Sequence, residues 1–170
     1  MRTALALAAL IVAAPLAAPA QEVDFDIQPT LDCIEQARRS DHRPLCVGEA
    51  AQACVRGIPN ASAVNVSLCM ERETRYWARR MEVAYDAMHE KAEAADAAFA
   101  QTEMAEKVPF KLTEDLALMQ DAWKDWREKR CAFEAMLRRG TPEASMSAAW
   151  CMVRQTGVQA LFLERSAAQD

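Results

Sequence analysis

The sequence predicts an all-α protein: a small helical bundle with one long helix, an antiparallel helix hairpin near the C-terminal end, and disulfide staples. Three observations support this fold class. Alanine is abundant, only 4 of 170 residues are glycine, and runs of β-branched residues are missing, which favours helices over strands. Apolar side chains recur at the helical period through most of the chain. Six cysteines provide the material for three disulfides.

The first twenty residues have the composition of a secretory signal peptide. A charged start is followed by an alanine- and leucine-rich run to Ala14, and Ala18-Pro19-Ala20 is a small-x-small cleavage site. The alternative, an uncleaved anchor helix, needs a longer apolar run to span a bilayer. We therefore expect residues 1–20 to be removed and residues 21–170 to form a single domain, periplasmic or secreted, with no stable membrane insertion. Because residues 1–20 contain one arginine and no acid, this domain carries a formal charge of −6.

Two short helices are expected first. Pro29-Thr30 opens one that runs to about Arg39, and Pro44 opens another that Gly57 stops. The longest periodic stretch then runs from near Asn65 to about Phe99. Its apolar face comprises Cys69, Trp77, Met81, Ala84, Tyr85, Met88, Ala92, Ala95 and Phe99.

The last two helices form the predicted hairpin. Thr113 is expected to cap a helix that runs to Arg139, where Gly140 ends it. Thr141-Pro142-Glu143 supplies a cap, a first-turn proline and a first-turn acid for the final helix. That helix is expected to bury Met146, Trp150, Val153, Gly157 and Leu161. Gly157 either permits a close crossing against the preceding helix or is simply tolerated.

Two of the four tryptophans lie in the first helix of this hairpin. At the helical period one face, predicted to belong to the core, contains Leu116, Met119, Trp123, Trp126, Arg130 and Phe133. A neighbouring stripe contains Trp123, Arg127, Cys131 and Glu134.

Helical rise tests the cysteine pairings. Cys131 and Cys151 lie at nearly equal distances from the turn between their helices, so they come level in an antiparallel hairpin. Cys54 and Cys69 come nearly level across the loop at Gly57. Cys33 and Cys46 remain, about a turn out of register, and the spacing leaves other pairings among these four open. A metal site is disfavoured because the chain contains no Cys-x-x-Cys, and His42 and His89 lie in unrelated contexts.

No catalytic motif is present: the chain has no serine-centred elbow, phosphate-binding glycine loop or His-Glu metal signature. We therefore expect no enzyme activity and no cofactor. Export and overall acidity disfavour nucleic acid as a partner.

Charge is distributed unevenly. Residues 82–121 contain ten acids against three lysines, a net charge of −7. The connection between the long helix and the tryptophan helix is thus the acidic end, with Glu103, Glu106, Glu114 and Asp115 as candidates for a docking face toward a cationic partner. The alternative is a solvated, solubilising surface. Arg72, Arg75 and Arg79 form a separate basic stripe, which is expected to be a solvated face.

Several segments resemble the LprI-type lysozyme-inhibitor domain family. Residues 123–131, Trp-Lys-Asp-Trp-Arg-Glu-Lys-Arg-Cys, are similar to its Trp-x-x-aromatic-Arg-x-x-x-Cys signature. The N-terminal half of the family pattern is similar to residues 46–54 and to Cys69 with Glu73, Trp77 and Tyr85. Its C-terminal end is similar to residues 151–161. Two departures stand out: Trp126 replaces the usual tyrosine, and residues 78–82 replace the usual Asp-x-x-Leu-Asn.

The resemblance implies a small, exported, disulfide-bonded helical domain. It implies structural roles for Trp123, Trp126, Arg127 and Glu134, with Arg127 either over a tryptophan ring or paired with Glu134. It also implies inhibition of a lysozyme-type muramidase, a cationic protein partner. The alternative hypothesis is a structural or assembly module of the cell envelope without an enzymatic target.

Overall fold

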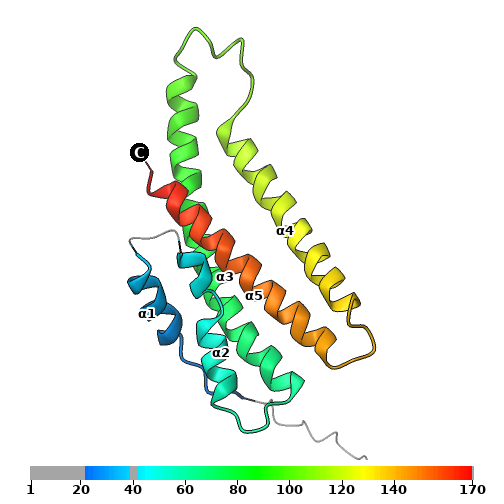
Figure 1. The fold of residues 1–170 in the computed structure, drawn as a ribbon. Coiled ribbons are helices and arrows are strands. Elements are labelled where there is room, and N and C mark those ends of the chain that lie inside the picture. The colour runs from blue at the N-terminus through cyan, green and yellow to red at the C-terminus, as the bar shows by residue number, and fades with distance from the viewer. Residues whose placement is uncertain (1–21, 39–41, 170) are drawn as a thin grey trace, which may run out of the picture.

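The computed structural model describes residues 22–38 and 42–169, and every regular element within these ranges is a helix (Figure 1). In chain order the elements are α1 (Gln28–Gln36), the 3₁₀ helix η1 (Arg43–Cys46), α2 (Glu49–Arg56), α3 (Ala63–Phe99), α4 (Leu112–Met136) and α5 (Glu143–Ala167). The predicted all-α bundle is confirmed. The expected signal peptide, residues 1–20, lies outside the described residues, as does the expected end of the first helix at Arg39.

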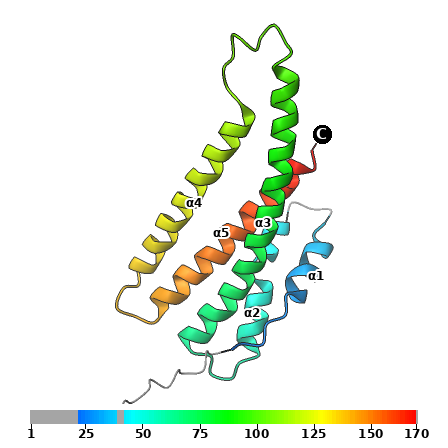
Figure 2. The ribbon, with the colours of Figure 1, turned by 180° about the vertical axis from the view of Figure 1, so that it is seen from behind.

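The long helix α3 and the last helix α5 form the centre of the molecule. α5 packs along α3, α4 runs back beside α5 as the outer arm of the hairpin, and α1, η1 and α2 cover the first half of α3 (Figures 1 and 2). The connection 100–111 lies at the far end of α3, beyond the point where α5 ends. Of the described residues, the last turns of α3, this connection and the first turn of α4 form the end of the molecule that lies beyond α5.

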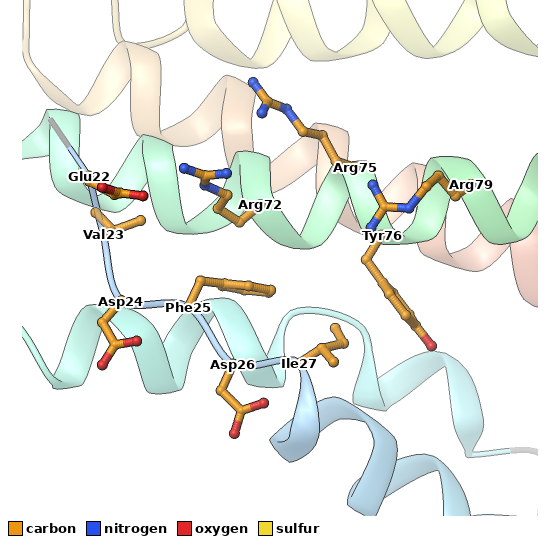
Figure 3. A pocket seen from close by; sticks show the side chains of 10 residues that line it. All are labelled: Glu22, Val23, Asp24, Phe25, Asp26, Ile27, Arg72, Arg75, Tyr76 and Arg79. Atoms are coloured by element: carbon orange, nitrogen blue, oxygen red, sulfur yellow. The ribbon is translucent and has the colours of Figure 1, made fainter. Parts of the chain in front are cut away.

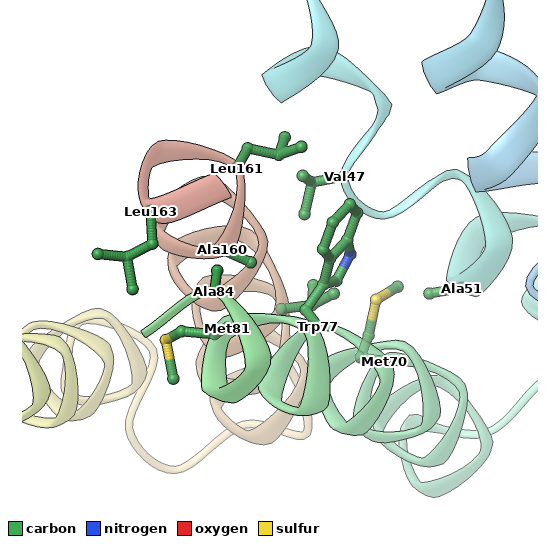
Figure 4. Close-up of a cluster of buried hydrophobic side chains, with 10 residues drawn as sticks. Val47, Ala51, Met70, Trp77, Met81, Ala84, Ala160, Leu161 and Leu163 are labelled. Atoms are coloured by element: carbon green, nitrogen blue, oxygen red, sulfur yellow. The ribbon is translucent and has the colours of Figure 1, made fainter. Parts of the chain in front are cut away.

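The core lies where α5 crosses α3, next to the junction of η1 and α2. Trp77 from α3, Leu161 from α5 and Val47 are buried together there (Figure 4). Gly157 permits this approach, because a Cβ at that position would lie 2.4 Å from Val47 Cγ1 and 3.1 Å from Trp77 Cε2. The close crossing at Gly157 is thus made with α3 and Val47, and the expectation that it would face the tryptophan helix is wrong.

The second helix expected from the sequence, residues 44–56, is broken into η1 and α2. Gly48 lies at the break with a φ of 102°, a conformation that L side chains rarely adopt. A Cβ on Gly48 would lie 2.4 Å from Cζ3 of Trp150 in α5. The break therefore lets Trp150 pack directly against the backbone.

A fully buried carboxylate joins α3 to the start of α2. Glu73 Oε1 accepts hydrogen bonds from the Gly48 N–H at 2.7 Å and the Thr30 hydroxyl at 3.0 Å. The Trp77 indole N–H donates to the same oxygen at 3.0 Å, and the Ala51 N–H donates to Oε2 at 2.8 Å. No side chain at the N-cap of α2 satisfies its free N–H groups. Glu73 accepts from the Gly48 and Ala51 N–H groups, and the Thr30 hydroxyl accepts from the Ala50 N–H at 2.9 Å, so an acid of α3 and a hydroxyl of α1 together cap α2.

Three disulfides connect neighbouring helices. Cys33 pairs with Cys46, Cys54 with Cys69, and Cys131 with Cys151, at Cα–Cα separations of 5.5, 5.8 and 5.3 Å. They join α1 to η1, α2 to α3, and α4 to α5. The first pair looks out of register when the first helix is extended to Arg39, but α1 ends at Gln36, so Cys33 lies three residues before the end of α1 and Cys46 three residues after the start of η1.

Most of the surface of α4 stays uncovered. Of its residues only Leu116, Gln120 and Cys131 are buried, whereas Trp126 is 46% and Phe133 64% exposed. The predicted tryptophan-rich core face is therefore wrong at four positions, since Met119 and Arg130 are exposed as well. The reason is that α4 packs along one edge, mainly against α5, and no further helix of the described chain covers its outer side (Figure 2).

The helix caps also differ from expectation. α5 begins at Glu143 without a side-chain cap, because the Thr141 hydroxyl donates to the Arg138 carbonyl at 2.9 Å instead. α4 ends at Met136, before the predicted Arg139. Its first turn is capped from α3 rather than by Thr113.

Candidate functional site

The four acidic side chains proposed as a docking face, Glu103, Glu106, Glu114 and Asp115, are all exposed at one end of the molecule (Figure 1). Two lie on the connection 100–111 and two on the first turn of α4. We call residues 93–119 the acidic tip. It contains six acids and two lysines, a net charge of −4. Among the described residues no other helix flanks the connection, so its charged side chains are exposed on more than one side.

Apolar side chains are exposed among these acids. Phe110 is 74%, Leu112 54% and Val108 36% exposed. Together with Phe99 they line a cavity of about 350 Å³. A second cavity of about 600 Å³, also touching Leu112, continues between α3, α4 and the end of α5. Exposed aromatic and aliphatic groups surrounded by charge are typical of protein contact sites, so this composition favours docking over a merely solubilising surface.

One carboxylate of α3 fixes the geometry of the tip. Asp96 Oδ1 accepts a hydrogen bond from the Leu112 N–H at 2.9 Å, and Oδ2 accepts from the Thr113 N–H at 3.1 Å and the Thr113 hydroxyl at 2.9 Å. The hydrogen bonds from the Leu112 and Thr113 backbone lower the pKa of Asp96 below its ordinary value of 3.8. Asp96 thus caps α4 across the connection. Local sequence pattern does not reveal this cap, because the capped residues lie 16 and 17 positions from Asp96.

Replacing Asp96 by asparagine is expected to loosen the first turn of α4 without unfolding the bundle. Asparagine supplies one acceptor oxygen in place of two, so hydrogen exchange of the Leu112 or Thr113 amide should accelerate about tenfold. The pKa of Asp96 in the folded chain lies below 3.8. The stabilisation that the ionised carboxylate gives to the Leu112 and Thr113 amides is therefore complete above that pH, and it is lost as the pH falls through the lower, folded pKa. Glu93→Gln, an exposed acid on the same helix, serves as the control and should leave both amides unchanged.

The residues of the tryptophan signature hold α4 against α5. The Arg127 guanidinium lies 4.9 Å from the centre of the Trp123 ring, and its Nη1 donates to the Thr156 hydroxyl at 3.2 Å. Burial lowers the pKa of Arg127. Of the two expected partners the tryptophan ring is therefore the one observed. Glu134 accepts from Arg130 Nε at 3.3 Å instead.

A second hollow lies along the first half of α3. Segment 22–27 runs beside it, and Arg72, Arg75 and Arg79 form the opposite rim of a cavity of about 610 Å³ (Figure 3). All three arginines are exposed, and Arg75 pairs with Glu71 of its own helix. Asp24 and Asp26 point away from the arginines in Figure 3. This arrangement agrees with the solvated basic face expected from the sequence.

Within residues 22–38 and 42–169 no group of three or more histidine, cysteine, aspartate or glutamate side chains is arranged to hold a metal ion. Across the same ranges no helix is long and apolar enough to cross a membrane. His89, on the long helix, has its Nδ1 3.7 Å from Glu93 at the surface.

Comparisons with known proteins assign the chain to a family. The family model described as lysozyme inhibitor LprI matches residues 57–163, from the end of α2 to near the end of α5. An uncharacterized 17.7 kDa protein encoded in the puhA 5′ region of Rhodobacter capsulatus is 37% identical over 138 residues, which is 81% of this chain and 84% of that protein. No solved structure matches. The matched range contains both helices of the hairpin, the acidic tip and the Trp123–Arg127 contact, and the chain belongs to the LprI lysozyme-inhibitor family.

Proposed function

We propose that this protein is an exported, non-catalytic inhibitor of a lysozyme-type muramidase and that it binds the enzyme with its acidic tip. Membership of the LprI family supports inhibition, and three disulfides favour a location outside the cytoplasm. The observation that carries the choice of surface is the exposed Phe110 on the acidic connection between α3 and α4.

The two parts of the tip have different roles in this proposal. The carboxylates of Glu103 and Glu106 attract a cationic enzyme over a range of about one Debye length and speed its approach, more strongly at low salt. Phe110 then supplies the apolar anchor, which gains affinity because its ring leaves water on binding. The hydrogen bonds from Leu112 and Thr113 to Asp96 hold the tip before binding, which limits the entropy lost on association.

A lysis assay tests the proposal. The full chain is expressed with its own leader, recovered oxidised from the periplasm, and mixed with a basic muramidase and cell-wall substrate. We expect stoichiometric inhibition that weakens as salt is raised. Absence of inhibition at stoichiometric excess would contradict the function, and would favour the alternative of an envelope module without an enzymatic target.

Variants at the tip locate the contact. Glu103→Lys with Glu106→Lys should raise the inhibition constant about tenfold at low salt, mainly through slower association. Phe110→Ser should raise it at least about tenfold through faster dissociation. Asp32→Lys with Glu35→Lys makes the same charge change on α1, away from the tip, and should leave inhibition unchanged. Equal loss from both charge pairs would mean that only net charge matters.

Export has its own test. Amino-terminal sequencing of the periplasmic protein is expected to begin at Gln21. A chain that still begins at Met1 in the membrane fraction would contradict cleavage and support an anchor.

A further inference from the structure

One flank of α4 carries exposed apolar side chains, and the first two of them, Leu112 and Met119, also line the cavity between α3, α4 and the end of α5. Leu112, Met119, Trp126 and Phe133 recur at every seventh position and are 54%, 39%, 46% and 64% exposed. Side chains seven residues apart stay on one side of a helix and drift by only about 20° per repeat. α4 therefore presents a continuous apolar stripe along its whole length.

This exposure exceeds what isolated surface side chains explain. α4 and α5 both have 25 residues, yet α4 buries three of them and α5 eight. On α5, Phe162 is 47% exposed. The hydrogen bond from Gln159 Nε2 to Gln120 Oε1, 3.0 Å long, sets a register that brings Phe162 about level with Met119. Contiguous apolar surface of this kind on a monomer marks an interaction site.

Charge along α4 indicates what covers the stripe. Residues 111–123 contain three acids and one lysine, a net charge of −2, whereas residues 124–139 contain six basic and three acidic residues, a net charge of +3. Two such helices side by side in parallel would place like charges together. In antiparallel orientation the acidic half of each helix lies beside the basic half of the other, so the dimer contains two such favourable contacts.

We infer that the occupant is a second copy of this chain, with α4 packed antiparallel against α4 around a two-fold axis. Apolar side chains at every seventh position stay in line when two helices cross at about 20°, and the positions three residues further on are Asp115, Ala122, Lys129 and Met136, so this contact combines apolar and charged pairs. Ala122 lies one helical turn before Trp126, near the middle of α4. A two-fold axis between them places the large Trp126 ring of each copy against the small Ala122 of the other. The Arg130 guanidinium, 5.1 Å from the Trp126 ring centre, shields the edge of the contact.

The size of the surface is sufficient for a stable dimer. A 25-residue helix is about 37 Å long. With the exposed flank of α5 it offers an area on the order of the 800 Å² that each partner buries in a standard interface. The arrangement is isologous, so it closes at two copies. It leaves Glu103, Glu106 and Phe110 free at opposite ends, and it does not depend on muramidase inhibition.

Analytical ultracentrifugation of the oxidised full chain tests the inference. We expect a dimer at micromolar concentration. Trp126→Glu and Phe133→Glu should each raise the dissociation constant at least about 100-fold while leaving the circular dichroism spectrum unchanged. Val83→Glu changes an apolar residue of α3 that is 70% exposed and should leave the dimer intact. A wild-type chain that stays monomeric at 100 µM, or a dimer that survives both α4 variants, overturns the inference.

Charge reversal tests the orientation. Asp115→Lys with Asp121→Lys makes the first half of α4 basic, and Lys129→Glu with Arg130→Glu makes the second half acidic. In an antiparallel dimer each double variant alone should dimerise about tenfold more weakly than wild type, and an equimolar mixture should recover wild-type affinity as a heterodimer. Double variants that dimerise as well as wild type would overturn the antiparallel arrangement. If the wild-type chain is monomeric and Trp126→Glu no longer inhibits the muramidase, the apolar stripe binds the enzyme and not a second copy of the chain.

Discussion

Replacing Glu73 by glutamine is expected to lower the free energy of unfolding by about 3 kcal/mol. The carboxylate accepts four hydrogen bonds in a site without exposure to water. In glutamine one of the two acceptor oxygens becomes an NH₂ group. That group faces either the Ala51 N–H or the donors from Gly48, Thr30 and Trp77, so at least one buried donor loses its partner whichever way the amide turns.

Urea unfolding followed by tryptophan fluorescence measures this loss. Glu71→Gln is the matched control, because Glu71 lies on the same helix but is exposed and pairs with Arg75 at the surface. We expect its effect to stay within about 0.5 kcal/mol. Should Glu73→Gln fall within the same range, the carboxylate does not hold α2 against α3 in the way that the hydrogen bonds indicate.

Removing the disulfide between α4 and α5 is expected to have an effect of similar size. Cys131 and Cys151 are separated by 20 residues, and opening a loop of that length should cost about 3 kcal/mol through the entropy of the unfolded chain. The loss has a local component as well. α4 buries few side chains, so without the bond to α5 it should open separately from the core.

Hydrogen exchange of dilute protein distinguishes the two components. In Cys131→Ala with Cys151→Ala, amides of α4 should exchange faster than those of α3. Cys33→Ala with Cys46→Ala removes a bond of comparable separation, 13 residues, that does not touch α4. It should lower global stability while leaving the ratio of α4 to α3 protection unchanged. Equal acceleration of α3 and α4 in the first variant would show that α4 is held by its packing rather than by the disulfide.

Local pattern was sufficient for much of the architecture. Helical periodicity and the positions of glycine and proline predict the long helix, the hairpin and the all-α class, because these depend on residues within a few positions of one another. The level positions of Cys131 and Cys151 follow from helical rise alone. The acidic charge of the α3–α4 connection is likewise visible from composition.

Packing decided the features that local pattern could not. The predicted single helix over residues 44–56 breaks at Gly48, which has a φ of 102°, and Trp150, about a hundred positions later, packs against the backbone there in the space that a side chain would need. Trp126 and Phe133 obey the period of a core face, yet nothing in the described chain covers them, because periodicity shows that side chains share a face and not which molecule that face meets.

Two carboxylates show the same division at the level of single residues. Glu73 stands between Cys69 and Trp77 on the buried face of α3, a position where an acid signals a satisfied polar contact. Three of its four donors come from α1 and from the start of α2, far from it in the sequence. Asp96 reaches across a twelve-residue connection to cap the next helix. Neighbouring residues carry the properties that could be predicted: which segments are helical, that Cys131 and Cys151 come level, and where the acidic end lies. Which acids are buried, which apolar stripe is left open and how the tip is held depend on hydrogen-bond partners and covering surfaces that folding brings together from distant parts of the chain.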